Sequence, residues 1–387
     1  AKSAYEQIAY HDWVSLAMAE ERLRLRRRVP DEQRLAWARQ TVASFEGRAP
    51  VEMAEIYARE QVFLHDEPEV EVKLQAIRIG DLGITAIPNE VYGITGLKLK
   101  SASPLAATFN IELANGAQGY IPPPEQHALG GYTTWAARTA GLEVEAEPKI
   151  VATLLKLLEQ VAGKPRRALL TPEGDYSTAV LASKPAAYWQ LSELAGTQAD
   201  DATGKYHGTY EPGVAFYLPG PTGAGFSNEG RGNRAAHFAG GRLRSAVKEL
   251  DDSYSVEFWF WNGLPHDARP VTGYLFSRGA DADTQAAGDH LGIGGTYQDG
   301  LAGKLFFFNG NELSELLVGR TTLELKSWNH VVLTRDSERV NVFLNGNPQP
   351  EISGDASRGY ADGVVQMFLG GRNDNLFNLE GKLDEIA

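Results

Sequence analysis

The stretch that decides the fold is SYSVEFWFW, residues 253–261, which has the length and composition of a β-strand. Further short alternating runs follow it, separated by Gly, Asn and Asp: GKLFFFNG (303–310), WNHVVLTRD (328–336), RVNVFLNG (339–346) and VVQMFLGG (364–371). The sequence NGN at residues 345–347 is a hairpin turn signal between strands. Many short strands at this spacing predict an antiparallel sandwich or jelly roll from residue 186 onward.

The part of the chain before this region shows helical patterns and one apolar strand pattern. Apolar residues at helical spacing predict a helix over residues 4–28, and Asp31 is the predicted N-cap of a second helix that runs to Phe45. Residues 149–162 predict a third, strongly apolar helix. Residues 76–87 are typical of a buried strand that a proline ends.

These patterns divide the chain into two parts. A length of 387 residues favours two domains. The stretch at residues 166–184 carries Pro and Gly at intervals and is typical of a linker. We therefore predict an α/β (α+β) N-terminal portion over residues 1–165 and an all-β C-terminal jelly-roll sandwich over residues 185–387.

Charge and residue content exclude several classes of function. The net charge of −13 argues against nucleic acid or an anionic membrane as a partner. The absence of cysteine excludes disulfides, thiolate zinc sites and cysteine nucleophiles. No apolar run approaches the ~18 residues of a membrane span, and the N-terminus has no signal-peptide pattern. Because the chain opens in a helical pattern, we interpret it as a mature or truncated piece of a longer protein.

The residues with the most chemical promise lie in QAIRIGDLGITAIPNEVYGITGLKLK (75–100) and ELANGAQGYIPPPEQHALGGYTT (112–134). Glu90 follows a predicted strand end, where side chains project into clefts. Tyr120 lies between a glycine and three nearby prolines that stiffen the chain, and Tyr132 follows twelve residues later. The residue types alone favour a solvated turn carboxylate and packing tyrosines over a metal site.

These two strings resemble the second half of the neutral/alkaline non-lysosomal ceramidase family, over roughly residues 50–160. Members of that family are zinc amidohydrolases that cleave the N-acyl bond of ceramide, and two histidines, a glutamate and a tyrosine hold the metal. The resemblance implies that Glu90 and Tyr120 are zinc ligands, that Tyr132 contacts the substrate, and that a sphingolipid or another N-acyl compound is the substrate. We expect Glu90 and Tyr120 to lie close together, with Tyr132 opening into the same cleft.

The sequence departs from this family at two points. Asn89 stands where the family usually has glycine, which concerns the turn beside Glu90. The histidine ligands and the nucleophile region belong to a part that should precede Ala1, and the eight histidines here form no H-x-H or H-x-x-x-H pair. Two protein ligands fall short of the three or four that a stable zinc site requires. We expect zinc in the parent hydrolase but not tightly bound here, and whether this chain is an enzyme stays open.

The second region carries eight motifs in a fixed order: PAAYWQLSE, AAHFAGG, SYSVEFWFW, LFSRG, KSWNHVVLTRD, VNVFLNGN, MFLGGRND and EGKLDEIA. In this order they resemble the LamG-like, concanavalin A-like jelly-roll domain that is appended to secreted bacterial proteins. The resemblance implies binding of carbohydrate or another extracellular surface, and a secreted or periplasmic location. The family normally continues for one more strand, so we expect the last strand to be missing.

Candidate binding residues of this domain lie in loops. Related jelly rolls often hold calcium, and Asp201 with Asp384 would supply oxygen ligands, although turn capping explains these acids equally well. The predicted ligand-binding residues are Tyr206, His207, Tyr210, Arg372 and Asn373. We place most of the domain's tryptophans in the core rather than on a sugar-binding surface: Trp189, Trp259, Trp261 and Trp328.

We interpret the chain as a fragment of a secreted ceramidase-like zinc amidohydrolase that carries a LamG-like carbohydrate- or surface-binding module and is inactive as it stands. The alternative is a non-enzymatic extracellular glycan-binding or adhesion protein with a remnant hydrolase-like domain. An H-x-H motif and a signal peptide encoded upstream of Ala1 would favour the first interpretation.

Overall fold

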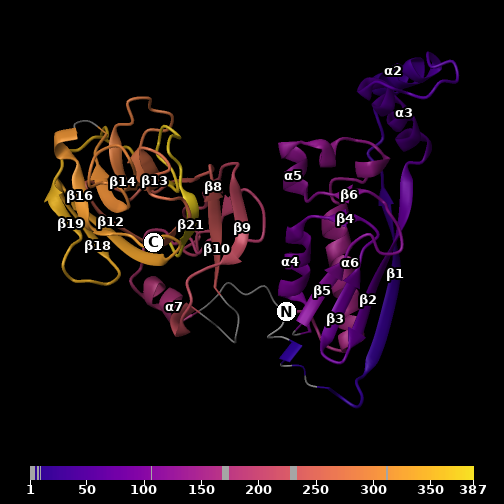
Figure 1. Cartoon of the computed structure of the whole chain (residues 1–387), viewed down its shortest axis with the longest axis horizontal. Helices are drawn as coiled ribbons and strands as arrows, with labels where there is room; N and C mark the ends of the chain where they lie inside the picture. The colour runs from indigo at the N-terminus through magenta and orange to yellow at the C-terminus, as the bar shows by residue number, and fades with distance from the viewer. Residues whose placement is uncertain are drawn as a thin grey trace. The chain divides into compact units, whose positions relative to one another are not determined.

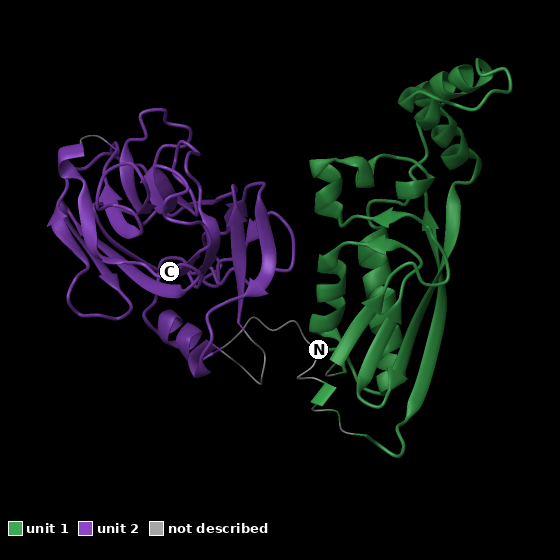
Figure 2. Ribbon diagram, in the orientation of Figure 1, with its two compact units in different colours: residues 1–169 green, residues 170–387 purple. Residues whose placement is uncertain are grey.

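The structure is a computed structural model that describes residues 5, 6, 8, 10–105, 107–167, 174–226, 233–310 and 313–387. It divides into two compact units, residues 1–169 and residues 170–387 (Figures 1 and 2). The first mixes helices and strands, and the second is a sandwich of β-strands with one flanking helix. The fold class predicted from the sequence is therefore confirmed.

The first unit is built on one mixed sheet and its helices. Its elements are β1 (Leu16–Arg26), α2 (Glu32–Ala43), α3 (Met53–Asp66), β2 (Glu69–Ile79), β3 (Leu82–Ala86), β4 (Glu90–Val91), α4 (Gly93–Ala102), β5 (Ala107–Ile111), β6 (Tyr120–Ile121), α5 (Pro124–Leu129), the 3₁₀ turns η1 (Tyr132–Thr134) and η2 (Arg138–Ala140), and α6 (Ala146–Ala162).

The main sheet of this unit has the strand order β1-β2-β3-β5. β1 and β2 pair antiparallel along their whole length, whereas β3 and β5 run parallel. Helix α6 packs on one face of the sheet, where Ile150, Leu154 and Leu158 are fully buried. A separate parallel pair, β4 with β6, lies outside this sheet.

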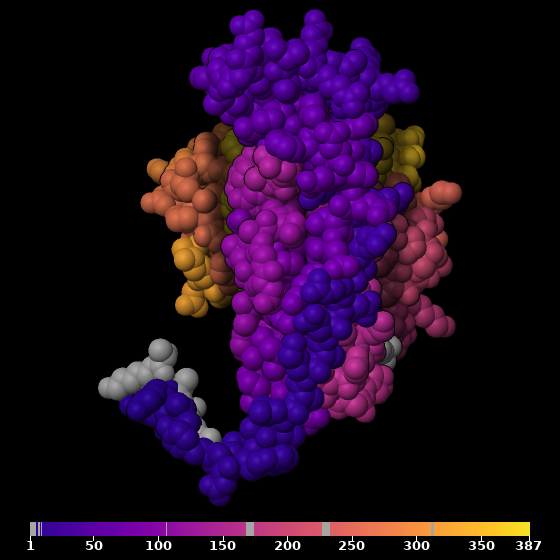
Figure 3. Space-filling model, turned by 90° about the vertical axis from the view of Figure 1, so that its right-hand side faces the viewer, coloured from indigo at the N-terminus to yellow at the C-terminus, as the bar shows by residue number. Residues whose placement is uncertain are grey.

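The helix expected over residues 4–28 is wrong for residues 16–26, which form strand β1. Burial alternates along the strand: Leu25 is buried, while Arg24 and Arg26 are exposed. The LRLR run has the period of two that a strand requires. Pairing with β2 over the full strand outweighs the helix propensity of the AEERLRLR sequence. Figure 3 shows this strand, in indigo, along one side of the unit.

The other sequence predictions for this unit concern one strand and two helices. The strand expected over residues 76–87 is the end of β2 and all of β3, joined by a two-residue turn in which Gly80 has a φ of +59°. The second and third predicted helices are confirmed as α2 and α6. Asp31 caps α2 by accepting a hydrogen bond from the backbone N–H of Arg34 at 2.7 Å. Helix α6 ends at Gly163 in the left-handed conformation.

The face of the main sheet opposite α6 carries a band of apolar side chains. Met18, Ile77, Ile84 and Phe109 lie directly opposite one another across β1, β2, β3 and β5. Met18 is 57% exposed and Phe109 is 41% exposed. The sheet is therefore buried on one face and has an open apolar band on the other.

The second unit consists of two large antiparallel sheets and their connections. Its elements are α7 (Asp175–Ala182), β7 (Gln198–Ala199), β8 (Gly208–Tyr210), β9 (Val214–Pro219), η3 (Ala224–Phe226), β10 (Arg234–Ala239), β11 (Leu243–Ala246), β12 (Ser253–Asn262), β13 (Val271–Gly279), β14 (Gly288–Gly294), β15 (Lys304–Phe308), η4 (Leu313–Glu315), β16 (Leu317–Thr322), β17 (Trp328–Asp336), β18 (Arg339–Leu344), β19 (Ile352–Asp355), β20 (Gln366–Leu369) and β21 (Glu380–Asp384).

The two sheets enclose the core of the sandwich. One has the order β19-β18-β17-β12-β21-β10-β9 and the other β16-β15-β14-β13-β20-β11-β8-β7. Phe258 and Phe260 of β12 pack between them with Phe276, Phe307 and Leu383. The five runs predicted as strands are β12, β15, β17, β18 and β20, and the NGN turn joins the paired strands β18 and β19.

Part of the stretch that we expected to be a linker is helix α7. Tyr176 of this helix packs on the ring of Trp259, with ring centres 6.2 Å apart, and on His330 at 6.4 Å. These two residues face away from the core on β12 and β17, so α7 covers part of the outer face of the seven-stranded sheet. The predicted linker residues 168–173 lie outside the described residues.

Candidate functional site

A short parallel strand pair brings together the three residues singled out in the first unit. β4 and β6 are paired so that Glu90 lies directly opposite Tyr120. The ring of Tyr132, in η1, meets the ring of Tyr120 edge-on, with ring centres 5.5 Å apart and an interplanar angle of 86°. The prediction that Glu90 and Tyr120 lie close together is confirmed, and Tyr132, which is 63% exposed, lies beside them.

Backbone contacts around Gly119 hold this pair in register. The amide of Glu90 donates to the carbonyl oxygen of Gly119 at 3.1 Å, and the side-chain amide of Asn89 donates to the same oxygen at 3.2 Å. Gly119 has a φ of +80°, and a Cβ atom there would lie 2.3 Å from the carbonyl oxygen of Thr139. Asn89 is fully buried, so it helps to fix the loop beside Glu90 in this chain.

The charge of Glu90 and the contact with Tyr132 keep Tyr120 protonated. Hydrogen bonding to Tyr132, partial burial and the negative charge of Glu90 together raise the pKa of Tyr120 to about 12. The hydroxyl of Tyr92 lies 2.7 Å from that of Thr133, beside Tyr132 in η1, which adds further polar groups. A carboxylate and neighbouring phenols can bind a hydroxyl, an amide or a cation through oxygen atoms.

These groups do not complete a zinc site. Glu90 and Tyr120 offer two donors, whereas a stable zinc site has three or four protein ligands. In the part of the chain that the structure describes, no three His, Cys, Asp or Glu side chains come together as metal ligands. Glu90 and Tyr120 could therefore supply two of the ligands of a zinc site, and the described residues do not supply the others.

In the second unit, Asp201 organises the turn in which it lies. Its carboxylate accepts hydrogen bonds from the backbone N–H groups of Tyr188, Thr203, Lys205 and Tyr206, at 2.7–3.0 Å, and from the hydroxyl of Thr203 at 2.7 Å. Both carboxylate oxygens are thus engaged by the fold.

Asp384 lies elsewhere, although calcium was predicted near both acids. It is fully buried, and burial raises its pKa well above the usual range. Asp201 pairs with one side of Trp189, and Ile386, two residues after Asp384, pairs with the other side. The backbones at Asp201 and Ile386 are therefore about two strand spacings, ~10 Å, apart. Calcium at either acid stays a prediction that melting with and without the ion will test.

The loop residues predicted to bind ligand form two separate groups. The carbonyl oxygen of Tyr206 accepts from the Ser245 hydroxyl at 3.3 Å. The carbonyl oxygens of Arg372 and Asn373 accept from the Arg242 guanidinium at 2.6 and 3.0 Å. Ser245 lies near one end of β11 and Arg242 precedes the other, so Tyr206 is separated from Arg372 and Asn373. Tyr210 pairs with Leu243, beside Arg242, but its side chain is buried.

These loop residues also differ in exposure. Tyr210 is 4% exposed and donates its hydroxyl to Glu193 at 2.8 Å, and Asn373 is fully buried. Both pack inside the fold and present little surface to a ligand. Arg372 is half-buried, and His207 is exposed. His207 therefore has the most accessible side chain among the predicted ligand-binding residues.

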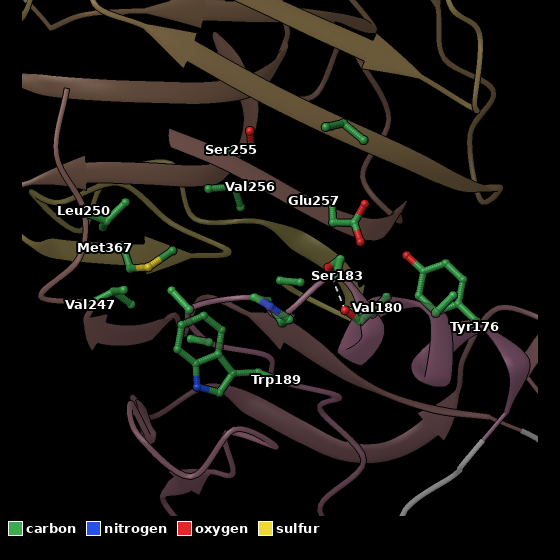
Figure 4. A pocket seen from close by; sticks show the side chains of 16 residues that line it. Tyr176, Val180, Ser183, Trp189, Val247, Leu250, Ser255, Val256, Glu257 and Met367 are labelled. Atoms are coloured by element: carbon green, nitrogen blue, oxygen red, sulfur yellow. Dashed lines mark hydrogen bonds between the residues drawn. The ribbon is translucent and has the colours of Figure 1, made fainter. Parts of the chain in front are cut away.

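A cavity of about 570 Å³ lies between α7 and the two sheets. Val247, Leu250 and Met367 line one side, and Tyr176 and Val180 of α7 line the other (Figure 4). Its walls are mostly apolar, with the carboxylate of Glu257 among the few polar groups. Burial raises the pKa of Glu257. The cavity is suited to an apolar group rather than to a sugar.

The tryptophans of the sandwich do not share one environment. Trp189 is 1% exposed and belongs to the core, as predicted. Trp259, Trp261 and Trp328 are half-buried on the outer face of the seven-stranded sheet, where α7 and η3 pack on Trp259, so the core assignment is wrong for these three. The alternation of SYSVEFWFW puts its two phenylalanines on one face and its two tryptophans on the other, but it does not tell which face meets the core.

Comparison with known proteins bears on the second unit. Residues 238–387 match the concanavalin A-like lectin/glucanases superfamily. This match covers less than half of the chain and supports the predicted jelly-roll fold. No curated protein matches the chain, and the comparisons give no support to the ceramidase resemblance of residues 50–160.

Several solved structures are similar to part of the chain. Domain 4 of AbnA, an extracellular arabinanase from Geobacillus stearothermophilus, in complex with arabinotriose, is 19% identical with a TM-score of 0.37, over 52% of this chain and 89% of that one. A Trypanosoma rangeli sialidase is 15% identical with a TM-score of 0.35, over 52% of this chain and 29% of that one. A SAP-like pentraxin from Limulus polyphemus is 17% identical with a TM-score of 0.27, over 38% and 67%. Likeness at this level says nothing of what this chain binds.

No helix among the described residues has both the length and the apolar character that a membrane span requires.

Proposed function

We propose that the second unit binds carbohydrate, as a module joined to part of a hydrolase. The observation that carries this proposal is the match of residues 238–387 to a superfamily of lectins and glucanases. The physical support is a rigid two-sheet scaffold with polar loops at its ends and aromatic rings on an outer face. A glycan on an extracellular surface, met by a secreted or periplasmic protein, is the partner we propose.

A glycan array tests this function. The fluorescently labelled full chain is applied at micromolar concentration, and hits are competed with the unlabelled chain and with the matching soluble oligosaccharide. We expect selective, competable binding to at least one class of glycan. A heat-denatured sample is the control for adhesion through exposed apolar surface. If the folded chain binds no glycan, or no better than the denatured sample, the proposal fails.

We also propose a role for the first unit, which is to supply the carboxylate and phenol side of a zinc amidohydrolase site for N-acyl substrates such as sphingolipids. The meeting of Glu90, Tyr120 and Tyr132, which are far apart in the sequence, supports this role. The remaining ligands would have to come from a segment outside this chain. The open apolar band on the main sheet is a surface against which such a segment would pack.

Metal analysis tests this second role. A protein that extends this chain by the segment encoded upstream should hold one zinc ion, and Glu90→Gln and Tyr120→Phe should each lower its zinc content and its cleavage of a short-chain ceramide. Glu125→Gln, a change at another glutamate of the same unit, is the control. Unchanged zinc content in the Glu90→Gln variant would contradict this role and favour the alternative, an adhesion protein with a remnant hydrolase-like domain.

A further inference from the structure

A row of aromatic and basic side chains crosses the outer face of the seven-stranded sheet. Trp261 lies directly opposite Trp328 on one side and Lys382 on the other, and His237 lies opposite Lys382. These four residues, here called the outer row, stand side by side on β17, β12, β21 and β10. At a strand spacing of ~4.8 Å the row is about 14 Å long.

The outer row faces away from the core of the sandwich. Phe260 and Leu383, the chain neighbours of Trp261 and Lys382, are fully buried between the sheets. Successive side chains of a strand point to opposite faces, so the outer row points outward. All four of its side chains are half-buried, which leaves part of each ring and of the lysine accessible.

Lys382 joins the members of the outer row. Its Nζ atom lies 4.9 Å from the ring centre of Trp261 and 5.7 Å from that of Trp328, and it donates to the carbonyl oxygen of Pro219 at 3.0 Å. The ring of His237 lies 6.4 Å from that of Trp261. Burial, and then the charge of Lys382, lower the pKa of His237. Its imidazole is therefore neutral near pH 7 and offers one donor and one acceptor.

The next row along the sheet is covered. Tyr176 of α7 and Phe226 of η3 pack on Trp259, with ring centres 6.2 and 5.2 Å apart. Tyr176 also packs on His330, which lies opposite Trp259 on β17. Helix α7 and η3 therefore border the outer row, and this arrangement gives a bound molecule a wall on one side.

We propose that the outer row is the surface on which the second unit binds a pyranose oligosaccharide, an inference that rests on the carbohydrate-binding function proposed above. The faces of Trp261 and Trp328 suit the apolar C–H faces of sugar rings. Lys382 and His237 supply hydrogen bonds to the ring hydroxyls next to them. A row of about 14 Å is long enough for about three linked rings lying across the strands.

Isothermal titration of the full chain tests this assignment, with the oligosaccharide class that the array selects, in increasing chain lengths. We expect Trp261→Ala and Lys382→Ala each to weaken binding, the tryptophan change by at least about tenfold. Trp13→Ala removes a tryptophan of the first unit that is 80% exposed, and this control should bind as the wild type does. The wild-type affinity should rise with chain length up to about three rings and then level off.

The outcomes separate this inference from the proposed function. Circular dichroism establishes that each variant is folded, and Lys382→Ala decides the question if Trp261→Ala does not fold. Folded variants with wild-type affinity overturn the outer row as the site and leave carbohydrate binding standing. Loss of binding in His207→Ala but not in Lys382→Ala places the glycan at the loops and also overturns it. A wild-type chain that binds no glycan overturns both.

Discussion

Breaking the buried ion pair of the sandwich should cost a large part of the free energy of unfolding. Arg335 and Asp289 are both 0% exposed, and their nearest nitrogen and oxygen lie 2.9 Å apart. Tyr254 donates its hydroxyl to the same carboxylate at 2.6 Å, and Arg335 also donates to the carbonyl oxygen of Ala356 at 3.0 Å. Removing one partner leaves a charge without its counter-ion inside the core, at a cost of about 3–5 kcal/mol.

Asp289→Asn and Arg335→Met should therefore each lower the free energy of unfolding by about 3–5 kcal/mol. The expected fall in Tm is roughly 6–20 °C for a unit of this size. Replacing both residues, by Leu and Met, should cost much less than the sum, because neither Arg335 nor Asp289 is then left without the other. The hydroxyl of Tyr254 then loses its acceptor, which costs about 1–3 kcal/mol.

Urea denaturation of the full chain, followed by tryptophan fluorescence, measures these changes. Burial raises the pKa of Asp289 to about 6, so pH 8 keeps the carboxylate ionised in the folded protein. The control is Asp355→Asn, which breaks the exposed pair with Arg339 at 3.0 Å and should cost less than about 1 kcal/mol. A loss below about 1 kcal/mol in Asp289→Asn, or additive effects in the double variant, would refute the reasoning.

Three further predictions concern Glu385, Asp201 and Gly119. Burial raises the pKa of Glu385 to about 7, so its contribution to stability is full below its unfolded pKa and is lost as the pH rises through the folded value; Glu385→Gln should flatten the pH profile of Tm, and an unchanged profile would contradict this. Asp201→Asn should cost about 2–3 kcal/mol in urea denaturation, because backbone N–H groups lose a charged acceptor, whereas Asp200→Asn should be neutral; equal losses would count against it. Gly119→Ala should destabilise the first unit by about 2 kcal/mol or more, because its φ is +80° and its Cβ would meet Thr139. Hydrogen exchange of the Glu90 amide measures that change, and wild-type protection would exclude it.

Local sequence patterns succeeded where one face of an element is apolar and the other is not. Helix α6 was predictable because Ile150, Leu154 and Leu158 recur at helical spacing, and Gly163 ends it. The strand SYSVEFWFW was equally clear as a strand. Which face of this strand meets the core was not predictable from the sequence, because both of its faces are aromatic. The pattern cannot tell whether Phe260 or Trp261 faces the core.

The remaining errors have non-local causes. Residues 16–26 have good helix formers, and their strand conformation depends on β2, which begins more than 40 residues later. Helix α7 is held by contacts of Tyr176 with residues of two distant strands. The closeness of Glu90 and Tyr120 was expected from the family resemblance alone, because β4 and β6 have two residues each and show no periodicity.

The strand order of the seven-stranded sheet has a consequence for how the sandwich can be made in a cell. β21 lies between β10 and β12 in the sheet, yet it follows β20 in the sequence. A nascent chain that emerges at about 5–20 residues per second presents β10 and β12 long before the strand that joins them. Until Glu380–Asp384 has left the ribosome, each of these two strands has an unpaired edge, and such edges promote association between chains. The sandwich therefore cannot complete its fold before β21 has been synthesised, and chaperone supply during expression should govern the yield of this protein.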